Sequence, residues 1–232
     1  MEIIKIQLRL SNAYLLRGDR PVLMDTGSPG DAGRIINALQ AAGVAPEDLA
    51  LIVLTHGHGD HAGSARELRA RSGAPVAIHP ADGDLVRSGK KALLSPTRLT
   101  GRIMAPFVNL SFPALEPDLL FEAGTTLAPW GVDGQVLHTP GHTGGSISLR
   151  LSDRQMIIGD LLMGGLMGGT FRPSRPGIHY FAEDQPAIFS SISRILEMNP
   201  QTFYVGHGGP LSASAVRIWL KNQPLPNTLQ IA

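Results

Sequence analysis

The feature that most constrains the fold is a run of metal-ligand residues placed directly after a short apolar stretch. Leu51–Leu54 has the length and character of a buried strand. His56, His58, Asp60 and His61 then fall within six residues and are separated by glycines. A chance or tag-like tract would not be internal, follow a strand and include an aspartate at a fixed place. Imidazole nitrogens with one carboxylate suit zinc, manganese or iron, so we expect a metal site on the loop that ends this strand.

The same design recurs three times, because an apolar strand ends near His142, near Asp160 and near His207. A glycine beside each of these residues lets the backbone turn sharply and lets the side chain stand in an open cleft. With the first tract, the chain offers five histidines and two aspartates as ligands. One zinc takes three or four protein ligands, so seven indicate two metals that share a bridging group.

Four motifs in this order resemble the metallo-β-lactamase superfamily. They are H-x-H-x-D-H at 56–61, T-P-G-H-T at 139–143, G-D at 159–160 and G-H-G at 206–208. The resemblance covers nearly the whole chain and implies an α/β fold, an αββα sandwich of two mixed β-sheets flanked by helices. It places the metals at the edge where the sheets meet. It also implies the ligand sets: His56, His58 and His142 for one metal, Asp60, His61 and His207 for the other, with Asp160 as the bridge.

This arrangement predicts a hydrolytic mechanism without a serine or lysine nucleophile. Two divalent ions would share a hydroxide whose pKa they lower towards neutrality, and the hydroxide would attack a carbonyl carbon. We expect zinc, with manganese or iron as alternatives. Asp60 is the candidate catalytic residue, because it can orient the hydroxide and take its proton.

Composition bounds the partners and the compartment. The chain has 232 residues, 43% hydrophobic and 17% charged, and a formal net charge of +1, which gives no electrostatic case for a nucleic-acid or membrane partner. It has no cysteine, which excludes disulfides and thiolate ligands. There is no apolar signal core and no run near the length of a membrane span, so we expect a cytoplasmic protein. Since no linker divides the chain, we predict a single domain over 1–232.

The hydrophobic pattern predicts strands in two groups, 2–79 and 119–205, with helices after Asp31, over 65–71, over 184–198 and over 213–221. A further strand is expected at 125–127 and a glycine-rich loop at 164–169. Residues 88–118 are expected to be a surface excursion, because prolines at 96, 106, 113 and 117 interrupt any long element.

Several other residues are candidates for the site. Asp25 begins an Asp-Thr-Gly turn after a strand, and we expect it to support the ligand loops by hydrogen bonds, with a plain turn role as the alternative. His179 and Tyr180 follow the loop after Asp160, and they either line the pocket or only pack. Arg172 and Arg175 either bind a substrate carboxylate or stay solvated.

Within the resembled superfamily, the details favour a small glyoxalase-II-like or lactonase-like hydrolase of a thioester, ester or lactone. Asp160 as the bridge disfavours lactam hydrolysis, and the short segment after His207 puts glutathione thioesters in doubt. Apolar residues over 103–112 and 161–171 predict either a pocket for a small acyl substrate or a homodimer surface. The alternatives are a mononuclear-iron oxygenase of the persulfide-dioxygenase kind and a non-catalytic regulatory metal-binding protein.

Overall fold

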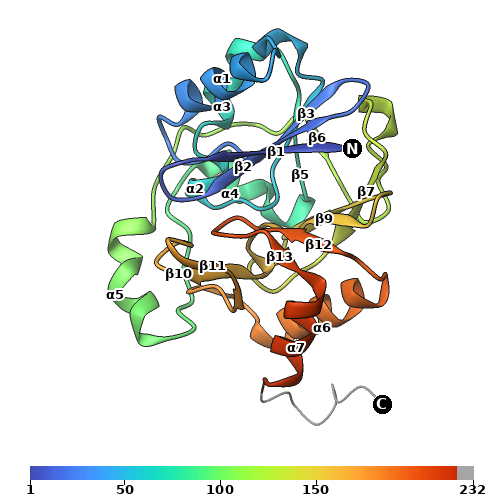
Figure 1. The fold of residues 1–232 in the computed structure, drawn as a ribbon. Coiled ribbons are helices and arrows are strands. Elements are labelled where there is room, and N and C mark those ends of the chain that lie inside the picture. Colours follow the sequence, from blue (N-terminus) through green and yellow to red (C-terminus); the bar gives the residue numbers. More distant parts are fainter. Residues whose placement is uncertain (224–232) are drawn as a thin grey trace.

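The fold has four layers: helices, a first sheet, a second sheet and helices (Figure 1). The computed structural model describes residues 1–223. In spatial order, the strands of the first sheet are β1 (Glu2–Gln7), β2 (Asn12–Arg17), β3 (Pro21–Met24), β4 (Leu51–Val53), β5 (Val76–Ile78) and β6 (Leu119–Leu120). Those of the second are β13 (Leu211–Ser212), β12 (Thr202–Tyr204), β9 (Gln155–Ile157), β8 (Ile147–Leu151) and β7 (Gly134–His138). Both sheets are mixed, since β3 to β6 are parallel in the first and only β12 and β9 are parallel in the second.

Two helices cover each outer face. α1 (Ala32–Ala41) and α3 (Ala65–Ser72) lie over the first sheet, and α6 (Gln185–Glu197) and α7 (Ala213–Lys221) lie over the second (Figure 1). The remaining helices are α2 (Gly59–Ala62), α4 (Gly83–Ser88) and α5 (Leu99–Val108), with single 3-10 turns η1 (Pro46–Asp48), η2 (Pro80–Asp82), η3 (Ala128–Trp130) and η4 (Gly159–Leu161). A separate hairpin, β10 (Met163–Leu166) with β11 (Phe171–Gly177), lies beside α5. The expected αββα sandwich is confirmed.

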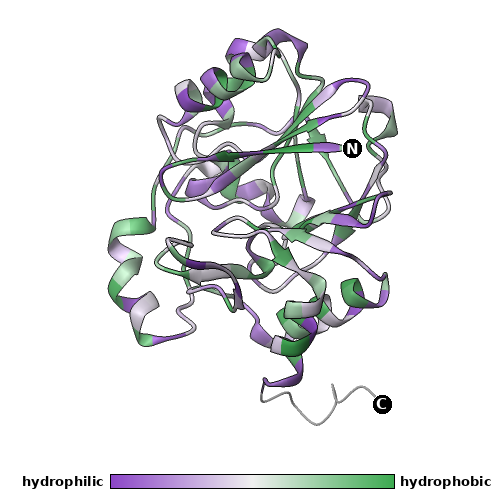
Figure 2. Cartoon of the chain, viewed as in Figure 1, coloured by the Kyte–Doolittle hydropathy of each residue, from purple (hydrophilic) through white to green (hydrophobic). Residues whose placement is uncertain are grey.

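The alternation of side chains along each strand builds this layering. In β4, Ile52 packs under the outer helices, whereas Leu51 and Val53 face the second sheet. In β2, Leu15 packs under the outer helices, whereas Tyr14 lies between the two sheets. A strand buried on both faces reads as a continuous apolar run, and Figure 2 shows such strands as the hydrophobic centre of the molecule. A third apolar cluster joins the second sheet to α6 and α7.

The outer helices begin and end where the sequence predicts. α1 buries Ile35, Ile36 and Leu39, and the chain leaves it at Gly43 with φ of 72°. α6 begins after Asp184, whose carboxylate accepts the Ala187 N–H at 2.9 Å.

Three local predictions are wrong. Residues 88–118 do run over the surface, but they contain the ten-residue helix α5, with Pro106 in its last turn, where the expectation was that prolines interrupt any long element. At 125–127 there is no strand but an isolated bridge between Thr126 and Gln135. The first half of the expected glycine-rich loop at 164–169 belongs to strand β10, and residues 167–170 form the turn of the hairpin β10–β11. Among residues 1–223, no helix is long and apolar enough to cross a membrane.

Candidate metal centre

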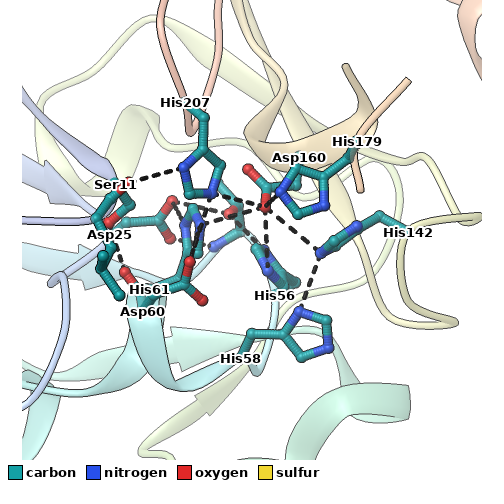
Figure 3. Close-up of polar contacts among 12 residues, drawn as sticks. Ser11, Asp25, His56, His58, Asp60, His61, His142, Asp160, His179 and His207 are labelled. Atoms are coloured by element: carbon teal, nitrogen blue, oxygen red, sulfur yellow. Dashed lines mark hydrogen bonds and ion pairs between the residues drawn. The ribbon is translucent and has the colours of Figure 1, made fainter. Parts of the chain in front are cut away.

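The side chains of all seven predicted ligands meet at one edge of the sandwich, together with His179 (Figure 3). Each of them comes from a loop or short turn that follows a strand or precedes a helix. His56 and His58 follow β4, and α2 carries Asp60 and His61. The other four come from the second half of the chain: His142 between β7 and β8, Asp160 in η4 after β9, His179 between β11 and α6, and His207 between β12 and β13.

Asp160 lies at the centre of this cluster. Its Oδ2 is 3.2 Å from His207 Nε2, 3.4 Å from His61 Nε2 and 3.5 Å from His142 Nε2. His179 Nε2 is 3.4 Å away and His56 Nε2 is 4.0 Å away. Five imidazole nitrogens therefore surround one buried carboxylate oxygen, and imidazole and carboxylate are the groups that bind zinc-like cations.

On the far side of each ring, hydrogen bonds fix the orientation of the histidines. His61 Nδ1 bonds Asp25 at 2.8 Å, His142 Nδ1 bonds the Phe181 carbonyl at 2.9 Å, and His207 Nδ1 bonds the Leu10 carbonyl at 2.8 Å. Each of these rings therefore carries a proton on Nδ1 and turns its Nε2 towards the cluster.

Asp25 lies behind the cluster and ties its first loop together. Its carboxylate also accepts the Thr55 N–H at 2.7 Å and the Thr55 hydroxyl at 2.8 Å. The Thr55 oxygen in turn lies 3.1 Å from His56 Nδ1. One buried carboxylate thus orients two histidines of the tract, directly for His61 and through Thr55 for His56.

Burial and charge divide the histidines into two sets. Burial lowers the pKa of His58 to about 4 and that of His142 to about 3, and burial with neighbouring imidazoles holds the pKa of His56 well below its usual value. These three rings are neutral at physiological pH, which is the form that binds a metal. Their ligand atoms form one compact group.

The second set lies between carboxylates. Burial alone would lower the pKa of His207, but the nearby charges of Asp160 and Asp60 raise it to about 10. The same competition raises the pKa of His61 well above its usual value. Asp60 Oδ2 lies 3.4 Å from His207 Nε2 and 3.9 Å from His61 Nε2, and these neighbours outweigh burial and hold the pKa of Asp60 below its usual range.

Several polar atoms at the centre have no hydrogen-bond partner among the described residues. They are Asp160 Oδ1 and the Nε2 atoms of His56, His61 and His207. Leaving a buried polar atom unpaired costs about 1–3 kcal/mol, so four together indicate a bound group that satisfies them. Side chains with ligand atoms within 4.8 Å of one another form the groups His56–His58–His142, His56–His61–Asp160, Asp60–His61–His207 and His142–Asp160–His179.

Asp82 is a supporting residue that the sequence reasoning missed. Its buried carboxylate accepts the Gly57 N–H, the Thr143 hydroxyl and the Gly145 N–H, each at 2.8 Å. It therefore joins the loop of His56 and His58 to the loop of His142. Asp82 follows β5, and β3 and β4 of the same sheet carry Asp25 and the tract at their ends, which was the available indication.

Close packing dictates glycine at position 206. A Cβ atom there would lie 2.0 Å from Asp160 Oδ1 and 2.6 Å from His61 Cε1. The backbone before His207 thus passes directly against the carboxylate, and any side chain would displace it.

A cavity of about 410 Å³ opens onto the cluster. His58, Asp60, His179 and His207 form its polar end. The rest of the lining is mainly apolar and includes Leu94, Met104, Val108, Leu110, Met167 and Phe181. Residues of α5 and of the β10–β11 turn therefore face the same space as the candidate ligands.

Tyr180 lies in the cavity wall and its hydroxyl accepts the Met167 N–H at 3.0 Å. Its ring stacks under the Arg98 guanidinium, 4.5 Å from the ring centre. Arg172 and Arg175 are exposed on β11 and do not line this cavity.

Comparison with known proteins decides the family. A model of the metallo-β-lactamase superfamily matches residues 6–207. The chain belongs to this superfamily. The resemblance drawn from the four motifs is thereby confirmed.

The chain has curated relatives in this superfamily. The probable metallo-hydrolase YflN of Bacillus subtilis is 29% identical over 232 residues, which cover 91% of this chain and 86% of the relative. Metallo-beta-lactamase domain-containing protein 1 of Xenopus laevis is 30% identical over 200 residues, covering 84% of this chain and 70% of the relative.

Solved structures agree on the fold. TTHA1623, crystallised in a di-iron-bound form, has a TM-score of 0.64 at 26% identity and covers 94% of this chain and 97% of its own. BLEG-1, a B3 metallo-beta-lactamase, has a TM-score of 0.67 at 23% identity and covers 92% of this chain and 95% of its own. At that identity, the second likeness speaks for the fold alone.

Proposed function

We propose that the protein is a metal-dependent hydrolase of a small thioester, carboxylic ester or lactone. The observation that carries the proposal is the cluster itself. Seven ligand side chains from separated loops converge at the polar end of a cavity, and four of their inward atoms lack hydrogen-bond partners among residues 1–223.

The donor set fits two divalent ions. His56, His58 and His142 would hold one, and Asp60, His61 and His207 would hold the other, with Asp160 between them. All donors are imidazole nitrogens or carboxylate oxygens, which suits zinc and leaves manganese and iron as alternatives. The di-iron form of TTHA1623 supports a two-metal reading for this chain.

When bound, such ions supply Lewis-acid activation of water and of the substrate carbonyl. The chain's own contribution is to place the reacting groups. Asp60 lines the cavity as an ionised carboxylate, so it is placed to accept a proton from the attacking water. The polar end beside the cluster is the place for the carbonyl, and the apolar side chains of the lining contact the rest of the substrate.

The cavity lining favours a substrate with an apolar acyl group. A volume of about 410 Å³ suits a small molecule, and the aliphatic and thioether side chains of α5 and the β10–β11 turn offer it apolar contact. α5 also exposes Leu99, Ile103 and Phe107 on its outer side, and a homodimer through this face is part of the proposal.

The test is elemental analysis followed by a substrate panel. We expect two equivalents of zinc or manganese per chain and hydrolysis of at least one class among p-nitrophenyl esters, lactones and thioesters. One equivalent of iron together with oxygen uptake would contradict the hydrolase proposal and indicate an oxygenase. A fully metal-loaded protein without turnover of any class would point to a binding role.

The role of Asp60 is tested separately by Asp60→Asn. The amide cannot accept the proton, so we expect turnover to fall by about 10²–10⁴-fold. Metal content is measured on the same sample. A variant that keeps both metals and full turnover removes Asp60 from any proton transfer.

A further inference from the structure

His179 lies within the cluster but outside the seven ligands that the four motifs supply. It comes from the loop between β11 and α6, and the segment 95–97 holds that loop from outside. Thr97 donates its hydroxyl to the His179 carbonyl at 2.7 Å and its N–H to the Tyr180 carbonyl at 2.9 Å. The Ala182 N–H bonds the Ser95 carbonyl at 2.9 Å. The position of the imidazole is therefore set by backbone contacts on both sides of it.

The hydrogen bonding of His179 is the reverse of that of the candidate ligands. His142 and His207 donate Nδ1–H to a carbonyl, whereas His179 Nδ1 receives the Phe181 N–H at 3.3 Å. A backbone N–H always carries its hydrogen, so the nitrogen facing it must offer a lone pair. The Phe181 carbonyl, which accepts the bond from His142, is also 3.3 Å from this nitrogen, but a hydrogen on Nδ1 would meet the hydrogen of the Phe181 N–H.

The proton of a neutral His179 ring is therefore on Nε2, the atom that faces the cluster. A neutral imidazole with a protonated Nε2 has no lone pair there for a metal, but it is a hydrogen-bond donor.

The Nε2–H group has room to act on a substrate. Its distance to Asp160 Oδ2 is 3.4 Å, which is long for a hydrogen bond, and His207 lies closer to the same oxygen. The ring stacks on that of His207, with centres 5.0 Å apart, and stands edge-on to His142. It also lines the cavity beside Asp60.

We propose that His179 binds no metal and that its Nε2–H donates a hydrogen bond to the substrate oxygen that gains negative charge during hydrolysis. This inference rests on the proposed hydrolase function. A donor fixed before the reaction stabilises the developing charge without the cost of reorienting it.

The test compares His179→Ala with His179→Gln and with the control His79→Ala. His79 lies outside the cluster, where it stacks on His138 at 4.2 Å between ring centres. For His179→Ala we expect the same metal content and the same resistance to a chelator as the unaltered protein. We expect kcat to fall about 10²–10³-fold with little change in KM. The affinity of the metal-loaded protein for hexylphosphonate, a tetrahedral anion, should fall at least tenfold.

His179→Gln should recover part of the kcat and of the hexylphosphonate affinity, since its amide can donate in place of Nε2–H. The control should match the unaltered protein in all three measurements. Loss of a metal equivalent in both His179 variants would make His179 a ligand and overturn the proposal. Unchanged kcat and unchanged hexylphosphonate affinity would also overturn it. If the unaltered protein hydrolyses no substrate, the proposed function fails, while metal content and phosphonate affinity still decide whether His179 is a ligand or a donor.

Discussion

Replacing Asp82 by alanine should separate the two histidine loops that its carboxylate joins. The variant leaves the Gly57 and Gly145 N–H groups without their acceptor and frees the Thr143 hydroxyl. Each buried N–H left unpaired costs about 1–3 kcal/mol. Part of this is offset, because burial raises the pKa of Asp82 and alanine removes the cost of burying that carboxylate. We expect a net loss of about 3 kcal/mol in the free energy of unfolding of the metal-free protein.

Urea unfolding followed by circular dichroism measures this loss. With a slope near 2 kcal/mol per molar urea, the midpoint should fall by about 1.5 M. The second readout is chelator competition. One metal equivalent should be lost more readily, because His56, His58 and His142 belong to the two loops that Asp82 joins. Asp84→Ala is the matched control. The Asp84 side chain lies two residues after Asp82, is 96% exposed and forms an ion pair with Arg87. An Asp82→Ala protein with an unchanged midpoint and unchanged metal retention would refute the reasoning.

Two further predictions concern the centre itself. Gly206→Ala should abolish retention of at least one metal, because its Cβ would lie 2.0 Å from Asp160 Oδ1; equilibrium dialysis checks this, and Gly33→Ala, where a Cβ meets no atom within 4 Å, should retain both metals. Metal binding at pH 7.5 should release protons, because the raised pKa values of His61 and His207 keep these rings protonated in the metal-free fold. For the same reason, the apparent affinity should rise with pH up to about 10, the pKa of His207. The stability that the protonated His207 ring gives the metal-free protein is complete below about pH 6.5 and is lost as pH rises from there through about 10. Calorimetry in buffers of different ionisation enthalpy measures the proton release, and a metal-binding enthalpy that is independent of the buffer would contradict it.

Much of the arrangement follows from local sequence patterns. Residues such as Leu51–Leu54 make a buried strand evident, and a glycine beside each of His142, Asp160 and His207 marks where a strand gives way to a loop. That the loops gather at one sheet edge was implied by the resemblance to the superfamily. The elements that were misread, α5 and the hairpin β10–β11, carry prolines and glycines whose local preference is overridden by packing around the cavity.

The sequence by itself therefore indicated the candidate ligand types, their order and the layered fold, since each is marked by patterns of residues near one another in the chain. Only the tertiary structure decided the roles of residues far apart in sequence. Asp82 is recognised by the two loops that its carboxylate joins. His179 is recognised by the backbone N–H that fixes its proton on the inward nitrogen. Neither contact has a spacing rule, because both depend on where separate loops come to lie.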